Sequence, residues 1–236
     1  MVILAFALTL VAALIPTFVW LIFFLREDVH PEPKKLILYA LAVGGLISFP
    51  VLAAQILFQA VLPAVVKSTI ILVIGLALIE EVFKFLAAYW AVNKKSAFDE
   101  PIDAMIYMIA AALGFAAVEN LFIVGNNLSL INVSGLPIAL NTLLLRFVGA
   151  TLLHTLTSGL VGYYWAKGKI RQSVPGNLTA GIVIATVIHA IFNYLILRFQ
   201  NSNLIFPSLL LIAAAFFILN DFEKLKTAEA KTELLK

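Results

Sequence analysis

The feature that most constrains this chain is a series of long apolar stretches separated by short polar segments. Residues 1–25 carry no charged side chain, and six further apolar stretches follow, each of about 18 residues or more. A helix of about 20 apolar residues is long enough to cross the hydrocarbon core of a bilayer. The sequence therefore predicts an all-α bundle of about seven membrane-spanning helices, at residues 1–25, 36–62, 68–92, 102–124, 137–165, 177–199 and 203–220.

The composition supports a membrane environment and argues against other classes. Of the 236 residues, 63% are hydrophobic and 12% are charged, which is about half the charged share of a soluble domain. So few charges cannot cover a soluble fold, whereas a lipid bilayer solvates apolar helices directly. The net charge of +3 is small, so we expect no nucleic-acid partner. The absence of cysteine excludes disulfides and thiol chemistry.

The basic residues predict an orientation, because short cytoplasmic loops are rich in Lys and Arg. The loops after the first, third and fifth spans and the C-terminal segment hold twelve of them: Arg26, Lys34, Lys35, Lys94, Lys95, Lys167, Lys169, Arg171, Lys224, Lys226, Lys231 and Lys236. The opposite side holds two, Lys67 and Arg198. We therefore predict a polytopic protein with its N-terminus outside and its C-terminus in the cytoplasm.

We expect a single transmembrane domain at residues 1–220, because no internal repeat or linker divides it, and a polar cytoplasmic tail at residues 221–236. Gly44, Gly45 and Gly114 lie within predicted spans. Small residues at such positions let neighbouring helices approach closely.

Polar side chains interrupt the predicted spans. A charge inside the bilayer costs about 3 kcal/mol on insertion scales, so each needs a partner or a function. They are Glu80, Glu81 and Lys84 in the third span, Asp103, Glu119 and Asn120 in the fourth, Arg146 and His154 in the fifth, and His189 and Asn193 in the sixth.

The depth of these side chains follows from the helical rise of ~1.5 Å per residue. Counted from the cytoplasmic ends of their spans, Glu80 and His189 lie at ~18 Å and His154 at ~16 Å. Three helices thus place carboxylates and imidazoles in one layer near the midplane. A second layer lies further out, with Asn193 at ~24 Å, Glu119 at ~27 Å and Arg146 at ~28 Å.

The adjacent acids of the third span allow two interpretations. Glu80 and Lys84 are four residues apart, which is the spacing of a helical ion pair. In the structural interpretation, Lys84 neutralises Glu80 while Glu81 packs against a neighbour. In the functional interpretation, Lys84 anchors one of the two acids and leaves the other as a general base.

The other polar residues also have structural alternatives. His189 and Asn193 could form a helix–helix hydrogen bond, and Glu119 and Arg146 an ion pair. Asp103 is expected only to complement the dipole of its helix. The common depth of the histidines and the adjacent acids favours a functional site.

Four blocks of the sequence occur in an order that resembles a known family. They are Glu80-Glu81-x-x-Lys84, the stretch FDEPIDAMIYMIAAALGFAAVEN at residues 98–120, the histidine His154, and His189-x-x-x-Asn193. These are similar to the EExxK motif and the later blocks of PrsW-type intramembrane proteases, members of the wider superfamily of CaaX-processing and bacteriocin-immunity proteases. Phe115-x-x-x-Glu119 stands where other branches of that superfamily have FxxxH.

The resemblance implies an intramembrane endopeptidase of a prokaryotic cell membrane, with a catalytic core at about residues 68–199. Its substrate would be a membrane-anchored protein. PrsW-type members make the first cut, at site 1, in an anti-sigma factor.

A mechanism can be written from the chemistry of these residues. Glu80, with Glu81 as the alternative, would activate a water molecule that His154 orients. His189 and Asn193 would donate hydrogen bonds to the developing oxyanion. The supporting residues would be Lys84, Glu119, Asn120 and Arg146.

Two questions stay open at the level of sequence. The first is metal dependence, because Glu80 or Glu81 together with His154 and His189 would form an acceptable zinc site. The second is the class of protein. A carboxylate–histidine relay also suits a proton-coupled transporter, and a non-catalytic membrane scaffold is the further alternative.

Overall fold

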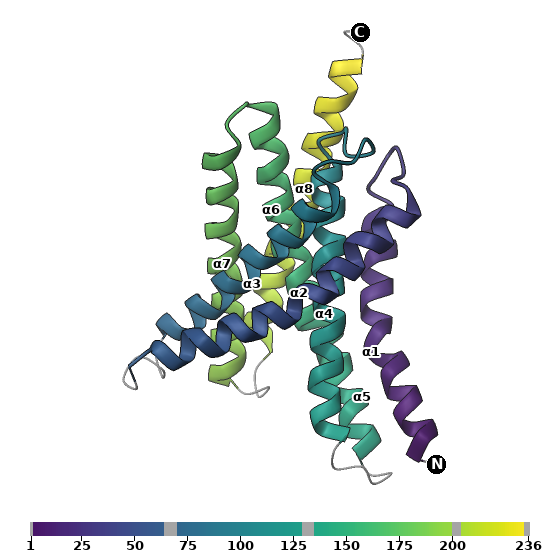
Figure 1. The fold of residues 1–236 in the computed structure, drawn as a ribbon, viewed down its shortest axis with the longest axis vertical. Helices are drawn as coiled ribbons and strands as arrows, with labels where there is room; N and C mark the ends of the chain where they lie inside the picture. Colours follow the sequence, from purple (N-terminus) through teal and green to yellow (C-terminus); the bar gives the residue numbers. More distant parts are fainter. Residues whose placement is uncertain (1, 64–69, 129–134, 200–203, 234–236) are drawn as a thin grey trace.

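The computed structural model describes residues 2–63, 70–128, 135–199 and 204–233, and within these ranges every regular element is a helix (Figure 1). In chain order the elements are α1 (Val2–Leu25), α2 (Lys34–Val61), α3 (Ile70–Val92), α4 (Asp103–Leu128), α5 (Gly135–Arg146), the π-helical turn η1 (Phe147–Thr151), α6 (Leu152–Ile170), α7 (Val174–Phe199) and α8 (Ile205–Glu233). The all-α prediction is confirmed.

Helix α4 forms the centre of the bundle. It contacts α1, α2, α3, α5 and α6, and residues 102–117 are all buried. A helix that is apolar around its whole circumference is expected at such a central position. Helices α2 and α3 run obliquely to the others (Figure 1), so residues on α3 do not rise through the bundle at the same rate as residues on α4.

Two of the predicted glycine contacts join α2 to α4. A Cβ atom on Gly114 would lie 1.8 Å from the carbonyl oxygen of Leu41, and one on Gly44 would lie 1.9 Å from that of Ala111. Both positions therefore exclude any larger residue unless the backbones move apart. The predicted close approach at Gly44 and Gly114 is confirmed, and it holds α2 against the central helix.

Five segments are long and apolar enough to cross a membrane: Lys34–Val61, Asp103–Gly125, Pro137–Ile170, Val174–Phe199 and Ile205–Ala228. Leu10–Leu25 is a shorter apolar helix, and α3 carries three charged side chains near its middle. The described helices thus support a multi-pass protein with five candidate spans. They do not support the count of seven or the orientation of the termini.

The fifth predicted span is one apolar segment built from three elements. The π-helical turn η1 separates α5 from α6, between Arg146 and His154. Such turns insert an extra residue into a helix and occur frequently at functional sites.

The predicted tail boundary at residue 220 falls inside α8, which continues to Glu233. Asp221, Phe222 and Leu225 are buried against the bundle, so the residues just after 220 pack as part of the helical body.

Candidate metal centre

Glu80, His154 and His189 meet where α3, α6 and α7 pack together, and we call these three residues the metal centre. All three side chains are buried, and one ligand atom of each lies within 4.8 Å of the other two. The Oε2 atom of Glu80 is 3.6 Å from Nε2 of His189 and 3.9 Å from Nδ1 of His154. The residues predicted to share one layer are therefore brought together.

The structure pairs Lys84 with Glu81. The Nζ atom of Lys84 lies 2.6 Å from Oε1 of Glu81, and the same oxygen accepts a hydrogen bond from Oγ1 of Thr157 at 3.0 Å. The structural interpretation in which Lys84 neutralises Glu80 is thus wrong, because the lysine is anchored one residue further along α3.

Glu80 is left with one unpartnered oxygen. Its Oε1 accepts a hydrogen bond from Nε2 of Gln55 at 2.9 Å, whereas its buried Oε2 has no hydrogen-bond partner among the described residues. Buried polar atoms are nearly always satisfied, so an oxygen that faces two imidazoles without a partner indicates a place for a ligand. Oε2 of Glu81 also lacks a partner within the described part of the chain, but Glu81 is already engaged through its other oxygen.

A carboxylate oxygen contacts one ring nitrogen of each histidine. Nδ1 of His189 lies 2.7 Å from Oε1 of Glu81, and Nε2 of His154 lies 3.1 Å from Oε2 of Glu119. If each of these nitrogens donates its hydrogen to the carboxylate, the other nitrogen of each ring turns a lone pair toward Glu80. Metal-binding histidines are usually oriented by a carboxylate in this way.

The donor set fits a metal ion. One carboxylate oxygen and two imidazole nitrogens are acceptable ligands for a divalent transition metal such as zinc, with a further position left for substrate. Nζ of Lys84 also lies 3.2 Å from Nδ1 of His154. A metal ion at this nitrogen needs the same lone pair, so Lys84 would then keep Glu81 as its partner.

Glu119 belongs to the same network, although its predicted depth placed it about 10 Å beyond His154. Arg146 donates through Nη2 to Glu119 at 2.6 Å and through Nε to Asn120 at 2.5 Å. Asn120 in turn donates to Oγ1 of Thr151 at 3.2 Å. The prediction of a separate outer layer is wrong for Glu119, because α6 continues to Ile170 and not only to the predicted end at Trp165, which places His154 deeper in the bundle, level with Glu119.

Phe115 explains the spacing of the Phe115-x-x-x-Glu119 block. Its ring packs edge-to-face on His154, with centroids 5.3 Å apart, while Glu119 contacts the same imidazole one turn later. His154 and His189 also pack edge-to-face, at 5.1 Å. The block therefore holds His154 from two sides.

Asn193 lies outside this network. It is half-buried, and no hydrogen bond joins its side chain to the metal centre in the described ranges. Conversely, sequence reasoning missed Gln55 and Thr157, which contact Glu80 and Glu81. The signal that could have found Gln55 is a polar side chain within an otherwise apolar span, and Thr157 lies one turn after His154.

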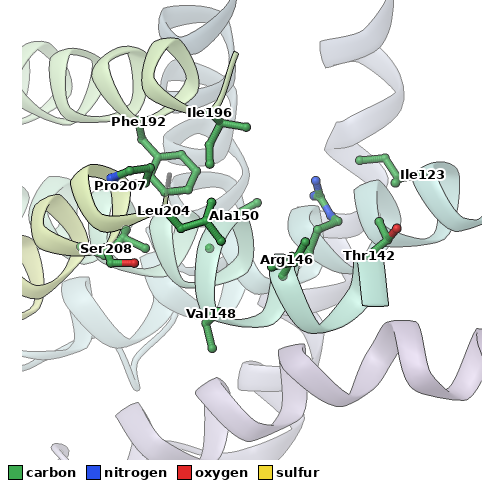
Figure 2. Close-up of a pocket in the computed structure, with 13 residues that line it drawn as sticks. Ile123, Thr142, Arg146, Val148, Ala150, Phe192, Ile196, Leu204, Pro207 and Ser208 are labelled. Atoms are coloured by element: carbon green, nitrogen blue, oxygen red, sulfur yellow. The ribbon is translucent and has the colours of Figure 1, made fainter. Parts of the chain in front are cut away.

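An apolar pocket of about 240 Å³ lies beside the network, between α4, α5, η1, α7 and α8 (Figure 2). Phe192, Leu204 and Pro207 gather on one side of it, with Arg146 and Thr142 on the other (Figure 2). Through Arg146 and Phe192 the pocket adjoins the elements that carry Glu119 and His189.

A second group of carboxylates, which we call the acidic cluster, comprises Glu32, Asp99 and Asp103. One oxygen of each lies within 4.8 Å of the others. Asp103 is fully buried and accepts hydrogen bonds from the backbone N–H groups of Asp99 and Glu100, while Tyr107 donates to Glu32. Asp103 therefore does more than complement the helix dipole, since its carboxylate joins the segment before α4 to the loop before α2.

These observations define a class: a helical membrane protein that holds a carboxylate and two carboxylate-oriented histidines inside its bundle. The sequence model of the PrsW family of intramembrane metalloproteases matches residues 32–220, and the chain belongs to this family. The match spans all four blocks found in the sequence.

Curated relatives agree with this assignment. The protease PrsW of Geobacillus kaustophilus is 27% identical over 178 residues, which cover 74% of this chain and 73% of the relative. The protease PrsW of Oceanobacillus iheyensis is 26% identical over 197 residues, covering 82% and 85%, and that of Bacillus subtilis 22% identical over 189 residues, covering 76% and 78%. No solved structure matches the chain. Family and relatives support an intramembrane protease with a protein substrate, in a bacterial membrane.

Proposed function

We propose that this protein hydrolyses a peptide bond of a membrane-anchored protein at the metal centre. The observation that carries the proposal is the unpartnered Oε2 of Glu80, which faces two imidazoles whose far nitrogens contact carboxylates. The family match supports proteolysis over the transporter and scaffold alternatives.

Glu80 Oε2, His154 Nδ1 and His189 Nε2 are the atoms that would hold a metal ion, and we propose zinc. When bound, zinc supplies Lewis-acid chemistry to a scissile carbonyl and to a water molecule. The remaining residues of the network act on these three ligands.

Glu81 and Glu119 orient the ligands. Each accepts a hydrogen bond from one imidazole and is itself neutralised, Glu81 by Lys84 at 2.6 Å and Glu119 by Arg146 at 2.6 Å. A buried carboxylate with its own cation stays ionised, because the pair removes most of the cost of burying either charge. Both imidazoles are thereby kept in one orientation.

In a site without metal, the same geometry supports a glutamate-type mechanism. Oε2 of Glu80 would take the proton of the attacking water, and His154 would hold that water in place. In this version His189 would carry hydrogens on both ring nitrogens. Nδ1–H would contact Glu81 and Nε2–H would donate to the developing oxyanion. The half-buried amide of Asn193, one turn further along α7, would donate beside it. Metal content distinguishes the two versions.

The surroundings of the site support an apolar substrate segment. The pocket beside Phe192 is lined mainly by apolar side chains, as a transmembrane segment of a substrate requires. We propose a single-span protein such as an anti-sigma factor, cut at site 1. The PrsW motifs also support membership in the CaaX-processing and bacteriocin-immunity superfamily.

We further propose that α1 and α3 cross the membrane as well, which gives seven spans with the N-terminus outside and the C-terminus in the cytoplasm. The charged side chains of α3 are buried against partners from other helices, so they need not face lipid. In this arrangement residues 1–220 form one transmembrane domain, with the catalytic core at about 68–199.

The deciding experiment is cleavage of single-span membrane proteins by the purified protein in liposomes, together with metal analysis. We expect one zinc ion per chain, loss of cleavage on chelation and recovery with zinc. Full activity after complete metal removal would contradict the zinc version. Full activity of a folded Glu80→Gln variant would contradict both versions.

A further inference from the structure

A second cavity, of about 410 Å³, lies between α6, α7 and α8. Its volume is within the range of small-molecule sites. Helix α6 lines it along its length, from Leu156 to Lys167, which spans about 16 Å at the helical rise. The cavity is thus long enough to extend from the bundle interior to the end of α6.

The lining changes from apolar to charged along this length. At the inner end it consists of aliphatic side chains such as Leu160 and Ile188, and toward the end of α6 it includes Tyr163, Tyr164 and Lys167. Helix α8 shows the same order, with Ala214 and Phe217 followed by Asp221 and Lys224. Both helices therefore present their charged residues at the same end of the cavity.

The charged end carries an excess of positive charge. Lys224 is paired with Asp221 at 2.6 Å, but Lys167 has no carboxylate within ion-pair distance among the described residues. Its ammonium instead lies 5.3 Å from the ring centroid of Tyr164 and 5.7 Å from that of Tyr163. An ammonium held over two aromatic rings, without an acidic partner, is available to an anion.

The apolar part of the cavity opens toward lipid. Ile184 is 38% exposed and Phe217 is 61% exposed, and both belong to segments long and apolar enough to cross a membrane. An acyl chain could therefore enter along these side chains. A water-soluble anion would leave this apolar surface uncovered.

We propose that this cavity binds one anionic glycerophospholipid. Its phosphate lies at Lys167 and Lys224, and an acyl chain follows Ile184 and Phe217 into the cavity. Basic pockets between transmembrane helices bind anionic headgroups by charge attraction, and each basic side chain contributes about fivefold in affinity. A zwitterionic lipid fits the apolar part equally well but gains less from the charged end, because the cation of its headgroup offsets the charge of its phosphate.

The inner end of the site touches the network around the metal centre. Thr157 lines the cavity and donates through Oγ1 to Glu81. Bound lipid would thus fill the space behind Thr157 and stabilise the packing of α6 against α7 and α8. We expect an increase in thermal stability when the lipid binds.

The test uses the purified full-length protein, stripped of lipid in detergent and titrated with phosphatidylglycerol or with phosphatidylcholine of the same chain length. Native mass spectrometry measures the bound lipid. We expect phosphatidylglycerol to bind more tightly than phosphatidylcholine. Lys167→Gln should weaken the binding of phosphatidylglycerol about fivefold and that of phosphatidylcholine by less. Lys167→Arg keeps the charge and should retain the preference.

Lys169→Gln is the matched control, since Lys169 lies two residues along the same helix but sits 3.6 Å over the ring of Phe98. Ala214→Trp provides an independent test, because it fills the cavity without changing its charge and should abolish the stabilisation by lipid. Inorganic phosphate should produce no stabilisation. Equal binding of both lipids, or equal loss in the Lys167→Gln and Lys169→Gln variants, would overturn the proposal.

Discussion

The metal centre and the acidic cluster are both built from carboxylates, but their surroundings differ. Around the metal centre, cations compensate the neighbouring carboxylates, with the buried Lys84 on Glu81 and the half-buried Arg146 on Glu119. In the acidic cluster, carboxylates face one another, and the hydroxyl of Tyr107 donates to Glu32. The first arrangement keeps negative charge and lone pairs available for chemistry.

The second arrangement places negative charge where it is poorly compensated. Burial raises the pKa of Glu32 above its ordinary value, and hydrogen bonds from Tyr107 and Asp103 offset this only in part. Burial likewise raises the pKa of Asp28, against the backbone N–H bonds that it accepts from Glu32 and His30. The comparison teaches that the partners of a carboxylate decide whether its charge is compensated by a cation or opposed by other carboxylates.

Substitution at Glu80 should have the largest effect on activity. Glu80→Gln removes the unpartnered oxygen, so we expect cleavage to fall about 10³-fold, the scale of a lost general base. Thermal unfolding in detergent should change little, because Gln keeps the volume and a hydrogen bond with Gln55 can persist. The matched variant in the acidic cluster, Glu32→Gln, should retain cleavage, and an equal loss in both would remove the functional contrast between the regions.

Substitution at Glu81 should act on stability as well as activity. Glu81→Gln leaves the ammonium of Lys84 buried without a carboxylate at 2.6 Å, which costs about 3–5 kcal/mol in the free energy of unfolding. The double variant Glu81→Gln/Lys84→Met removes the unpaired charge and should recover much of this loss while staying inactive. If Glu81→Gln unfolds at the wild-type temperature, the ion pair does not stabilise the bundle.

Glu119→Gln tests whether Glu119 orients His154. An amide at this position can no longer act as a charged acceptor for Nε2 of His154, and loss of such a partner lowers metal affinity or activity about 10–100-fold. Zinc titration against a competing chelator measures the change. An unchanged zinc affinity would show that Glu119 only forms the ion pair with Arg146 and does not orient His154.

Gln55→Ala should produce a smaller loss, since one hydrogen bond from a neutral amide to the carboxylate of Glu80 contributes about 1.5 kcal/mol. We expect cleavage to fall about tenfold. Gln59→Ala is the matched control, because Gln59 lies one turn along α2 and is exposed. Equal activities of the two variants would show that Gln55 does not position Glu80.

Substitution in the acidic cluster should have the smallest effect, and this effect should be visible only as a change in the pH dependence of stability. Because the pKa of Glu32 is raised in the folded protein, the folded state binds the proton more tightly than the unfolded state. Stability should therefore fall as the pH rises from the ordinary glutamate value of 4.5 through the folded pKa. The unfolding temperature of Glu32→Gln should depend less on pH than that of the wild type, and an equal pH dependence of the two proteins would contradict this role of Glu32.

Much of the membrane architecture was readable from the sequence. Apolar length predicts helices that a bilayer can hold. The rarity of polar residues within these stretches also singled out Glu80, His154 and His189, because each such residue is costly in lipid unless it has a partner. Spacing and composition are local properties of the sequence, so they can be interpreted without knowledge of the fold.

The choice between partners was decided only by the tertiary structure. Sequence spacing favoured an ion pair between Lys84 and Glu80. In the structure, Thr157 and His189 contact Glu81 from other helices, and the ammonium of Lys84 pairs with that carboxylate. Glu119 reaches His154 despite its calculated depth, since α6 continues to Ile170, beyond the predicted end of its span at Trp165. Helical rise is a constant of the backbone, whereas the ends, tilt and rotation of the helices come from side-chain packing between helices, and no single segment contains that information.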